Sequence, residues 1–163
     1  MSGHSRAPSI PESEAAVLGA AIRDSEMAEI VVSELQQTDF QSIRNQNVFK
    51  ALQDLSEQQL KANPVSIAER AGCQRSEIDE ICLLANGIGT EIQAIVSDVR
   101  RVGGLRRVYE ACQASTGQIS KDSNLEEILE SLEKGLYKSA RDGSNEAAEG
   151  SDVLGNVVQD FLD

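Results

Sequence analysis

The chain has 163 residues, which is long enough to bury a hydrophobic core without disulfides or metal ions. Aromatic residues make up 3% of it, tryptophan is absent and three prolines are present, so Leu, Ile, Val and Ala must form the core, which favours an all-α fold. The net charge of -12 argues against direct binding of nucleic acid, because phosphate contacts need clustered Lys and Arg side chains.

The first part of the chain predicts a polar arm and then a globule. Residues 1–9 are poor in large apolar side chains, which is typical of a disordered arm. Residues 10–99 should form a compact bundle of about five to six helices. Apolar residues at helical spacing predict three of them over 13–23, 25–35 and 43–60. The first follows a proline in the segment IPESEAAVLGAAI, residues 10–22.

Two shorter helices follow in the predicted globule. Ser66 and Glu69 have the spacing of a capping box, which would open a short helix that Gly72 ends. Ser76 and Asp79 have the same spacing and would open the next helix. We therefore expect the globule to be helical throughout.

Two longer patterns predict an antiparallel helical hairpin over residues 90–140 that protrudes from the bundle. Apolar residues recur every three to four positions from Ile92 to Ile119, so this helix would be about 45 Å long and its far half would have no bundle to lie on. Four leucines of the second helix are spaced four, three and four, which is typical of a coiled-coil seam. The residues that we expect to contact a second copy or a partner are Leu105, Val108, Leu125, Ile128, Leu129, Leu132 and Leu136.

Two glycines and four arginines lie within the long helical pattern. Gly103 and Gly104 cost about 1 kcal/mol each relative to alanine, so we expect a kink or a close helix contact there. The arginines form the only basic cluster of the sequence. They would either stay solvated or paired with neighbouring carboxylates, or contact another subunit or a partner protein; they are Arg100, Arg101, Arg106 and Arg107.

The end of the chain predicts a flexible linker over 141–150 and a short amphipathic helix over 151–163. The apolar side chains of this helix would suit a groove on another domain. They are Leu154, Val157, Val158 and Phe161.

No catalytic, cofactor-binding or metal-binding residues are predicted. Residues 135–139 imitate a phosphate-binding loop but lack its second glycine. The three cysteines form no C-x-x-C pair, and Cys82 and Cys112 lie on apolar stripes, so we expect them in the core. No apolar run has the length of a membrane span and no secretory signal is present, so we expect a cytoplasmic protein without membrane contacts.

Four segments, in this order, resemble the N-terminal domain of the DnaB-type replicative DNA helicases. They are the Pro-led Val-Leu-Gly opening in 11–22, Asp39-Phe40 with the helix NVFKALQDL at 47–55, PVSIAERA at 64–71, and the long helical pattern around 100–107. The terminal segment SDVLGNVVQDFLD matches the linker helix of that family. The segment QSIRNQN after Phe40 departs from it, because many relatives carry aromatic and histidine residues there.

The resemblance implies a non-catalytic oligomerisation and docking domain. Hairpins would pair into homodimers, three dimers would form a hexameric collar, and the collar would bind primase. The linker helix would pack onto the motor domain of a neighbouring subunit, and ATP and Mg²⁺ would belong to that motor domain only. A stand-alone helicase regulator or loader, for example of phage origin, and the helicase-binding domain of a primase are the alternatives.

Overall fold

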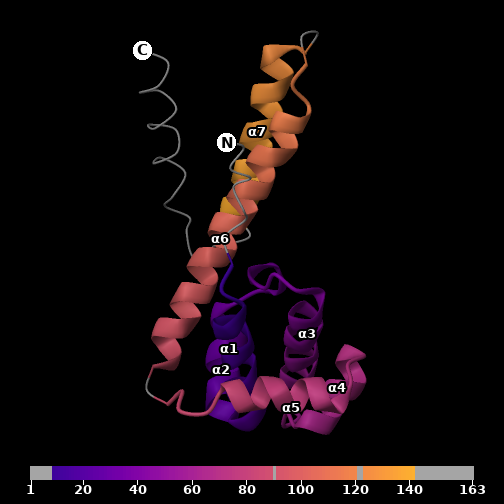
Figure 1. Ribbon diagram of the computed structural model, residues 1–163, viewed down its shortest axis with the longest axis vertical. Helices are drawn as coiled ribbons and strands as arrows, with labels where there is room; N and C mark the ends of the chain where they lie inside the picture. Colours follow the sequence, from indigo (N-terminus) through magenta and orange to yellow (C-terminus); the bar gives the residue numbers. More distant parts are fainter. Residues whose placement is uncertain (1–8, 90, 121–122, 142–163) are drawn as a thin grey trace, which may run out of the picture.

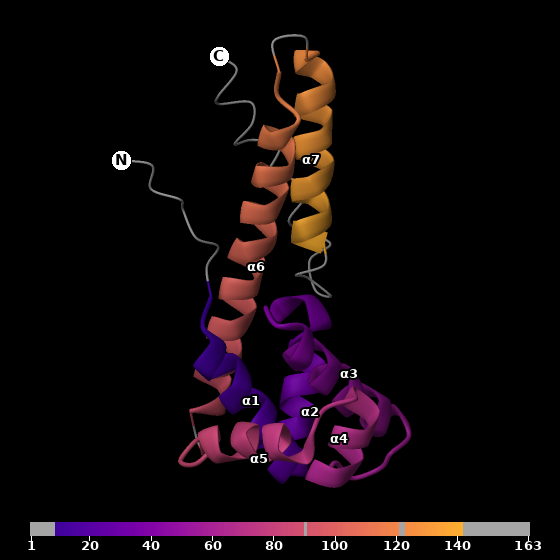
Figure 2. The same cartoon turned by 45° about the vertical axis from the view of Figure 1, so that its right-hand side comes forward.

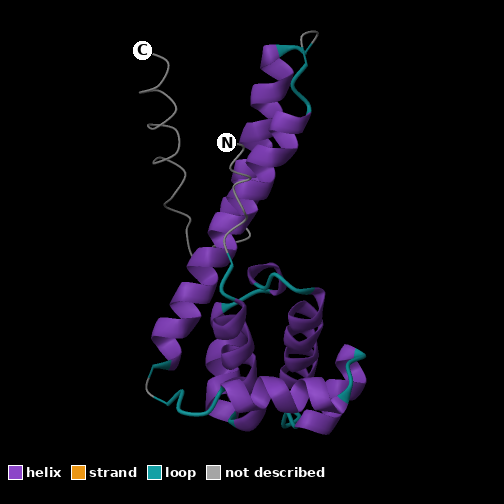
Figure 3. Cartoon of the chain, in the orientation of Figure 1, coloured by secondary structure: helices purple, strands orange, loops and turns teal. Residues whose placement is uncertain are grey.

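The computed structural model describes residues 9–89, 91–120 and 123–141, and the regular secondary structure there is entirely helical (Figure 3). The all-α fold with a protruding antiparallel hairpin is therefore confirmed. The predictions for 1–8 and 142–163, with Leu154, Val157, Val158 and Phe161, lie outside the described residues. The elements are α1 (Pro11–Arg23), α2 (Ser25–Glu34), the 3-10 helix η1 (Gln37–Asp39), α3 (Ile43–Glu57), α4 (Pro64–Ala71), α5 (Arg75–Leu84), α6 (Ile92–Gly117) and α7 (Leu125–Arg141).

Helix α1 is the centre of the globule and packs against α5, α2, α3 and α6. Its residues from Glu14 to Ile22 are all buried. Figure 1 shows α5 and α4 crossing one end of the globule, below α1 and α3. Gly19 permits this crossing, because a Cβ at this position would collide with the backbone carbonyl oxygen of Ile81 in α5. The glycine of the Val-Leu-Gly opening is thus a packing residue.

Two helix starts differ from the predicted capping boxes. Asn63 caps α4, since its side chain accepts the N–H groups of Val65 and Ser66, and Ser66 bonds back to the N–H of Asn63. In α5 the capping box is formed by Gln74 and Glu77. Each true box begins two or three residues before the predicted one, so local spacing identified the helix but not its first residue.

Helix α6 leaves the globule, and α7 returns antiparallel beside its far half (Figure 2). Its near half is anchored by Ile92, Val96, Val99 and Val102, which are buried. The helix has 26 residues, so it is about 39 Å long, somewhat shorter than expected. Among the described residues, the near half of α6 anchors the hairpin to the globule, and the far half of α6 packs against α7.

Candidate protein-binding face on the hairpin

The two hairpin helices meet through small side chains. Gly135 of α7 lies so close to Ala111 of α6 that a Cβ on the glycine would be 3.2 Å from the Ala111 Cβ. Ser115, one turn further along α6, is buried. On α7, Ile128 and Leu132 lie seven and three residues before Gly135, hence on the same side, and both are half-buried. These contacts define the seam of the hairpin.

Outside the seam, large apolar side chains remain open to solvent. Leu105 and Val108 of α6 are 48% and 41% exposed, and Ile119, two residues after α6, is 61% exposed. On α7, Leu125 and Leu129 are 71% and 48% exposed. Cys112 is also exposed, although we expected it in the core. We call these six residues the hairpin face: Leu105, Val108, Cys112, Ile119, Leu125 and Leu129.

The hairpin face lies on one side of the hairpin. The hairpin-face residues within each helix lie clockwise from the residues that meet the other helix, when the helix is viewed from its own N-terminus at 100° per residue. Tyr137 of α7, which is 61% exposed, lies opposite the seam and outside this face. Because the helices run antiparallel, the two clockwise sides project from the same side of the pair. The opposite side carries exposed residues, which are Ala114 of α6, its C-cap Gln118, and Glu127 and Lys134 of α7. The hairpin therefore has one apolar and one polar side.

The structure sorts the predicted interface residues into two groups. Leu105, Val108, Leu125 and Leu129 are open to another molecule, whereas Ile128, Leu132 and Leu136 are half-buried beside α6. Cys112 and Ile119 were not among the residues predicted to form the interface. Cys112 follows Leu105 by seven residues and Ile119 follows Cys112 by seven, and this heptad spacing was the signal that could have included them.

The four arginines do not form one basic surface. Arg100 lies 3.6 Å from Glu34, Arg101 lies 3.2 Å from Asp98, and both are at least half exposed. Arg106 and Arg107 instead point into the protein, where their guanidinium groups bind buried carboxylates. This corrects the candidate partner contact at these two positions, because both side chains are used within the chain.

The carboxylates that bind these arginines come from α1 and η1. The Arg106 Nη2 donates to Glu14 Oε1 at 2.8 Å, and the Arg107 Nη1 donates to Asp39 Oδ1 at 2.6 Å. Burial raises the pKa of the Asp39 carboxyl, although hydrogen bonds from Arg107 and from the Gln36 N–H act in the opposite direction. The charges at the exit of α6 from the globule are thus buried and internally paired.

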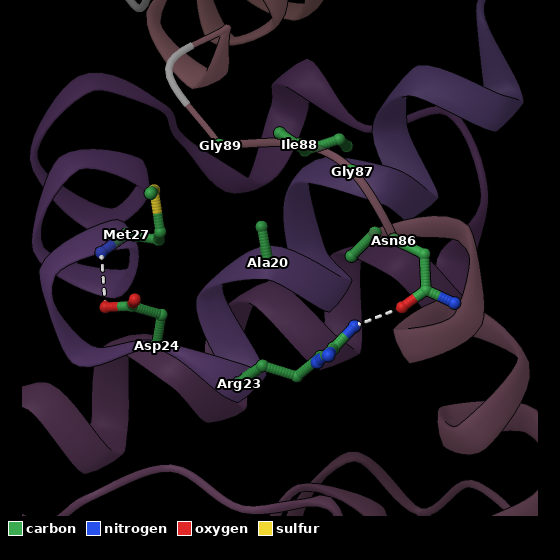
Figure 4. A pocket seen from close by; sticks show the side chains of 9 residues that line it. Ala20, Arg23, Asp24, Met27, Asn86, Gly87, Ile88 and Gly89 are labelled. Carbon is green, nitrogen blue, oxygen red and sulfur yellow. Dashed lines mark hydrogen bonds between the residues drawn. The ribbon is translucent and has the colours of Figure 1, made fainter.

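A surface depression of about 470 Å³ lies between the end of α1 and the loop that follows α5 (Figure 4). Its charged side chains are Arg23 and Asp24. Arg23 donates to Asn86 Oδ1 at 2.6 Å, and Asp24 accepts the Glu26 N–H at 2.8 Å as the cap of α2. Both charges therefore hold local structure together, and we assign no ligand to the depression.

The described residues contain neither a metal-binding cluster nor a membrane-spanning helix. No cluster of three or more His, Cys, Asp or Glu side chains there is arranged to hold a metal ion. No described helix combines the length and the apolar character needed to cross a bilayer.

The chain is similar to a known protein family and to solved structures. The family model described as the DnaB-like helicase N terminal domain matches residues 6–100. The fold is similar to the crystal structure of the N-terminal domain of DnaB helicase from Mycobacterium tuberculosis, with 21% identity and a TM-score of 0.69 over 82% of this chain and 99% of that chain. No curated protein matches.

Proposed function

The chain belongs to the family of DnaB-like helicase N-terminal domains, and we propose that it is the non-catalytic, self-associating domain of a replicative DNA helicase. The family match supports the helicase domain over the helicase-binding domain of a primase. ATP and Mg²⁺ would serve a motor domain of the parent protein, and we propose no cofactor for this chain.

The hairpin face carries this proposal. Its apolar residues line one side of a hairpin whose other side is polar. Several exposed apolar side chains on one side of a helix pair are typical of a protein contact. A second copy offers the identical surface, and two-fold pairing would cover both at once, as in most homodimers. The hairpin face is thus suited to a hairpin-to-hairpin dimer.

The family resemblance supports two further steps. We propose that the dimers assemble into a ring-shaped collar and that this collar is the docking surface for primase. Arg100 and Arg101, which are half exposed or more, remain candidates for contacts between subunits or with a partner. Leu154, Val157, Val158 and Phe161 remain candidates for a contact of the linker helix with a neighbouring motor domain.

Oxidative footprinting by hydroxyl radicals tests the dimer side chain by side chain. In a dimer, Leu105 and Leu129 should be oxidised more slowly than Leu60 and Leu84, which are similarly exposed in the isolated chain at 53% and 50%. The globule leucines serve as internal controls within the same sample. Oxidation of all four leucines at similar rates would contradict pairing through the hairpin face.

A stand-alone helicase regulator or loader would use the same hairpin face. The coding sequence beyond Asp163 distinguishes the two roles. A nucleotide-binding domain with its phosphate loop there would support the helicase, and a stop codon would support the regulator.

A further inference from the structure

The contact between the hairpin and the globule changes character along α6. From Ile92 to Val102 the buried residues of α6 are apolar, and Arg100 adds a half-exposed ion pair with Glu34 of α2. In the next turn the contact residues are Gly103, Arg106 and Arg107, which lie on one side of the helix at positions i, i+3 and i+4. At this turn the contact of α6 with the globule is therefore ionic.

The first ion pair joins α6 to α1. The side chains of Arg106 and Glu14 are 5% and 1% exposed. Glu14 also fixes the loop before α3, because its Oε2 accepts the Gln41 N–H at 2.9 Å and the Asn45 Nδ2 at 3.4 Å. Arg106 donates in addition to the Asp39 backbone carbonyl at 3.4 Å. One buried group of bonds thus connects α6, α1 and η1.

The second ion pair joins α6 to η1. The side chains of Arg107 and Asp39 are 10% and 1% exposed. Asp39 Oδ2 accepts the Gln36 N–H at 3.0 Å, so the carboxylate is fixed from two directions. Gly103 allows this approach, since a Cβ there would lie 2.7 Å from the Asp39 Cα.

These bonds differ physically from the apolar contacts of the preceding turns. Apolar burial is non-directional, so it stabilises a contact without requiring a particular hydrogen-bond geometry. A buried ion pair adds little net stability compared with an apolar pair of similar volume, but its hydrogen bonds require a defined geometry. Two such pairs on one turn of α6 therefore affect the direction of the hairpin more than the stability of the folded chain.

We propose that Glu14–Arg106 and Asp39–Arg107, together with Gly103, form an orienting joint that fixes the direction of the hairpin relative to the globule. Releasing the joint lets the hairpin swing about the end of its apolar anchor while the globule stays folded. The joint is intramolecular, so it holds whether or not the hairpin face binds a second copy.

The test is an intramolecular distance distribution measured by electron spin resonance. Spin labels on non-canonical amino acids replace the exposed residues Glu69 of α4 and Gln118 at the end of α6, which leaves the native cysteines in place. Dilution with unlabelled chain removes distances between molecules. A fixed hairpin gives one narrow distribution.

The variant that releases the joint combines Glu14→Gln, Arg106→Met, Asp39→Asn and Arg107→Met. It removes all four charges and keeps amide oxygens to accept the Gln41 and Gln36 N–H groups. We expect the distribution to become at least twice as wide, while the urea midpoint stays near that of the parent. Variants that change one pair alone should give an intermediate width.

The matched control removes the exposed ion pair of α5 with Arg75→Met and Asp79→Asn, and its distribution should equal that of the parent. An unchanged width in the folded four-residue variant would overturn the proposal. Loss of the folded globule in that variant and in both single-pair variants would overturn it too, because the pairs would then be required for folding itself.

Discussion

Arg106 and Glu14 are 92 positions apart in the sequence, yet their side chains meet at 2.8 Å inside the protein. The pair connects the helix that carries the hairpin face to the helix at the centre of the globule. Removing one partner would leave the other charge buried and unpaired, which is far more costly than removing both.

We therefore expect Arg106→Met alone to lower the free energy of unfolding by about 3–5 kcal/mol, because the Glu14 carboxyl is left buried without its ion-pair partner. Urea denaturation followed by circular dichroism measures this. Arg101→Met, which removes a 63% exposed side chain from the same helix, is the control and should change stability by no more than about 1 kcal/mol. If the two substitutions lowered the free energy of unfolding equally, the buried pair would be no more important for stability than the exposed one.

The neighbouring glycines of α6 should respond to alanine in opposite directions. In Gly103→Ala the new methyl group would press on the Asp39 backbone, and overpacking of this kind costs about 1–3 kcal/mol. In Gly104→Ala the nearest atom, the Arg107 Nη2, is 3.8 Å away, so the higher helix propensity should stabilise the chain by about 1 kcal/mol. Thermal unfolding of the two variants provides the comparison, and a shift of both melting temperatures in the same direction would refute it.

The Asp39 carboxyl should make its own contribution to the pH dependence of stability. Burial raises the pKa of Asp39 in the folded chain above the ordinary value of 3.8. At pH values between 3.8 and this raised pKa, the folded chain therefore binds more protons than the unfolded chain. The contribution of Asp39 to the free energy of unfolding therefore falls as the pH rises through this window. Asp39→Asn lacks the titrating group, so the stability of the parent relative to this variant should be greater at about pH 4 than at pH 7. Urea midpoints at both pH values measure the difference; the opposite trend would mean that the pairing with Arg107 outweighs burial.

Regular periodicity made the helical fold predictable. The four-three-four leucine spacing of α7 and the long apolar pattern of α6 identified the hairpin, since both depend on neighbours along the chain. The roles of Arg106 and Arg107 were not predictable in the same way, because their carboxylate partners are far away in the sequence and become visible only when α1 and η1 are placed beside α6.

The hairpin face shows the same limit of sequence reasoning. Periodicity placed Leu129 and Leu132 on one stripe, but Gly135 determines which side of α7 meets α6, and so which leucine is covered. Once the seam is located, it is clear that Leu129 lies on the exposed side and Leu132 on the half-buried edge. Cys112 was likewise assigned to the hairpin face only after the position of the seam showed that its side chain is exposed.

The mass of the chain in solution, measured by sedimentation velocity at micromolar concentration, tests the central claim most directly. We predict that the parent chain sediments as a dimer or a larger assembly and that Leu129→Asp shifts it to the monomer, because a charge would then lie in the hairpin face. Val65→Asp, at an equally exposed position of α4, should leave the assembly intact. A monomeric parent, or an assembly that Leu129→Asp leaves unchanged, would contradict self-association through the hairpin face.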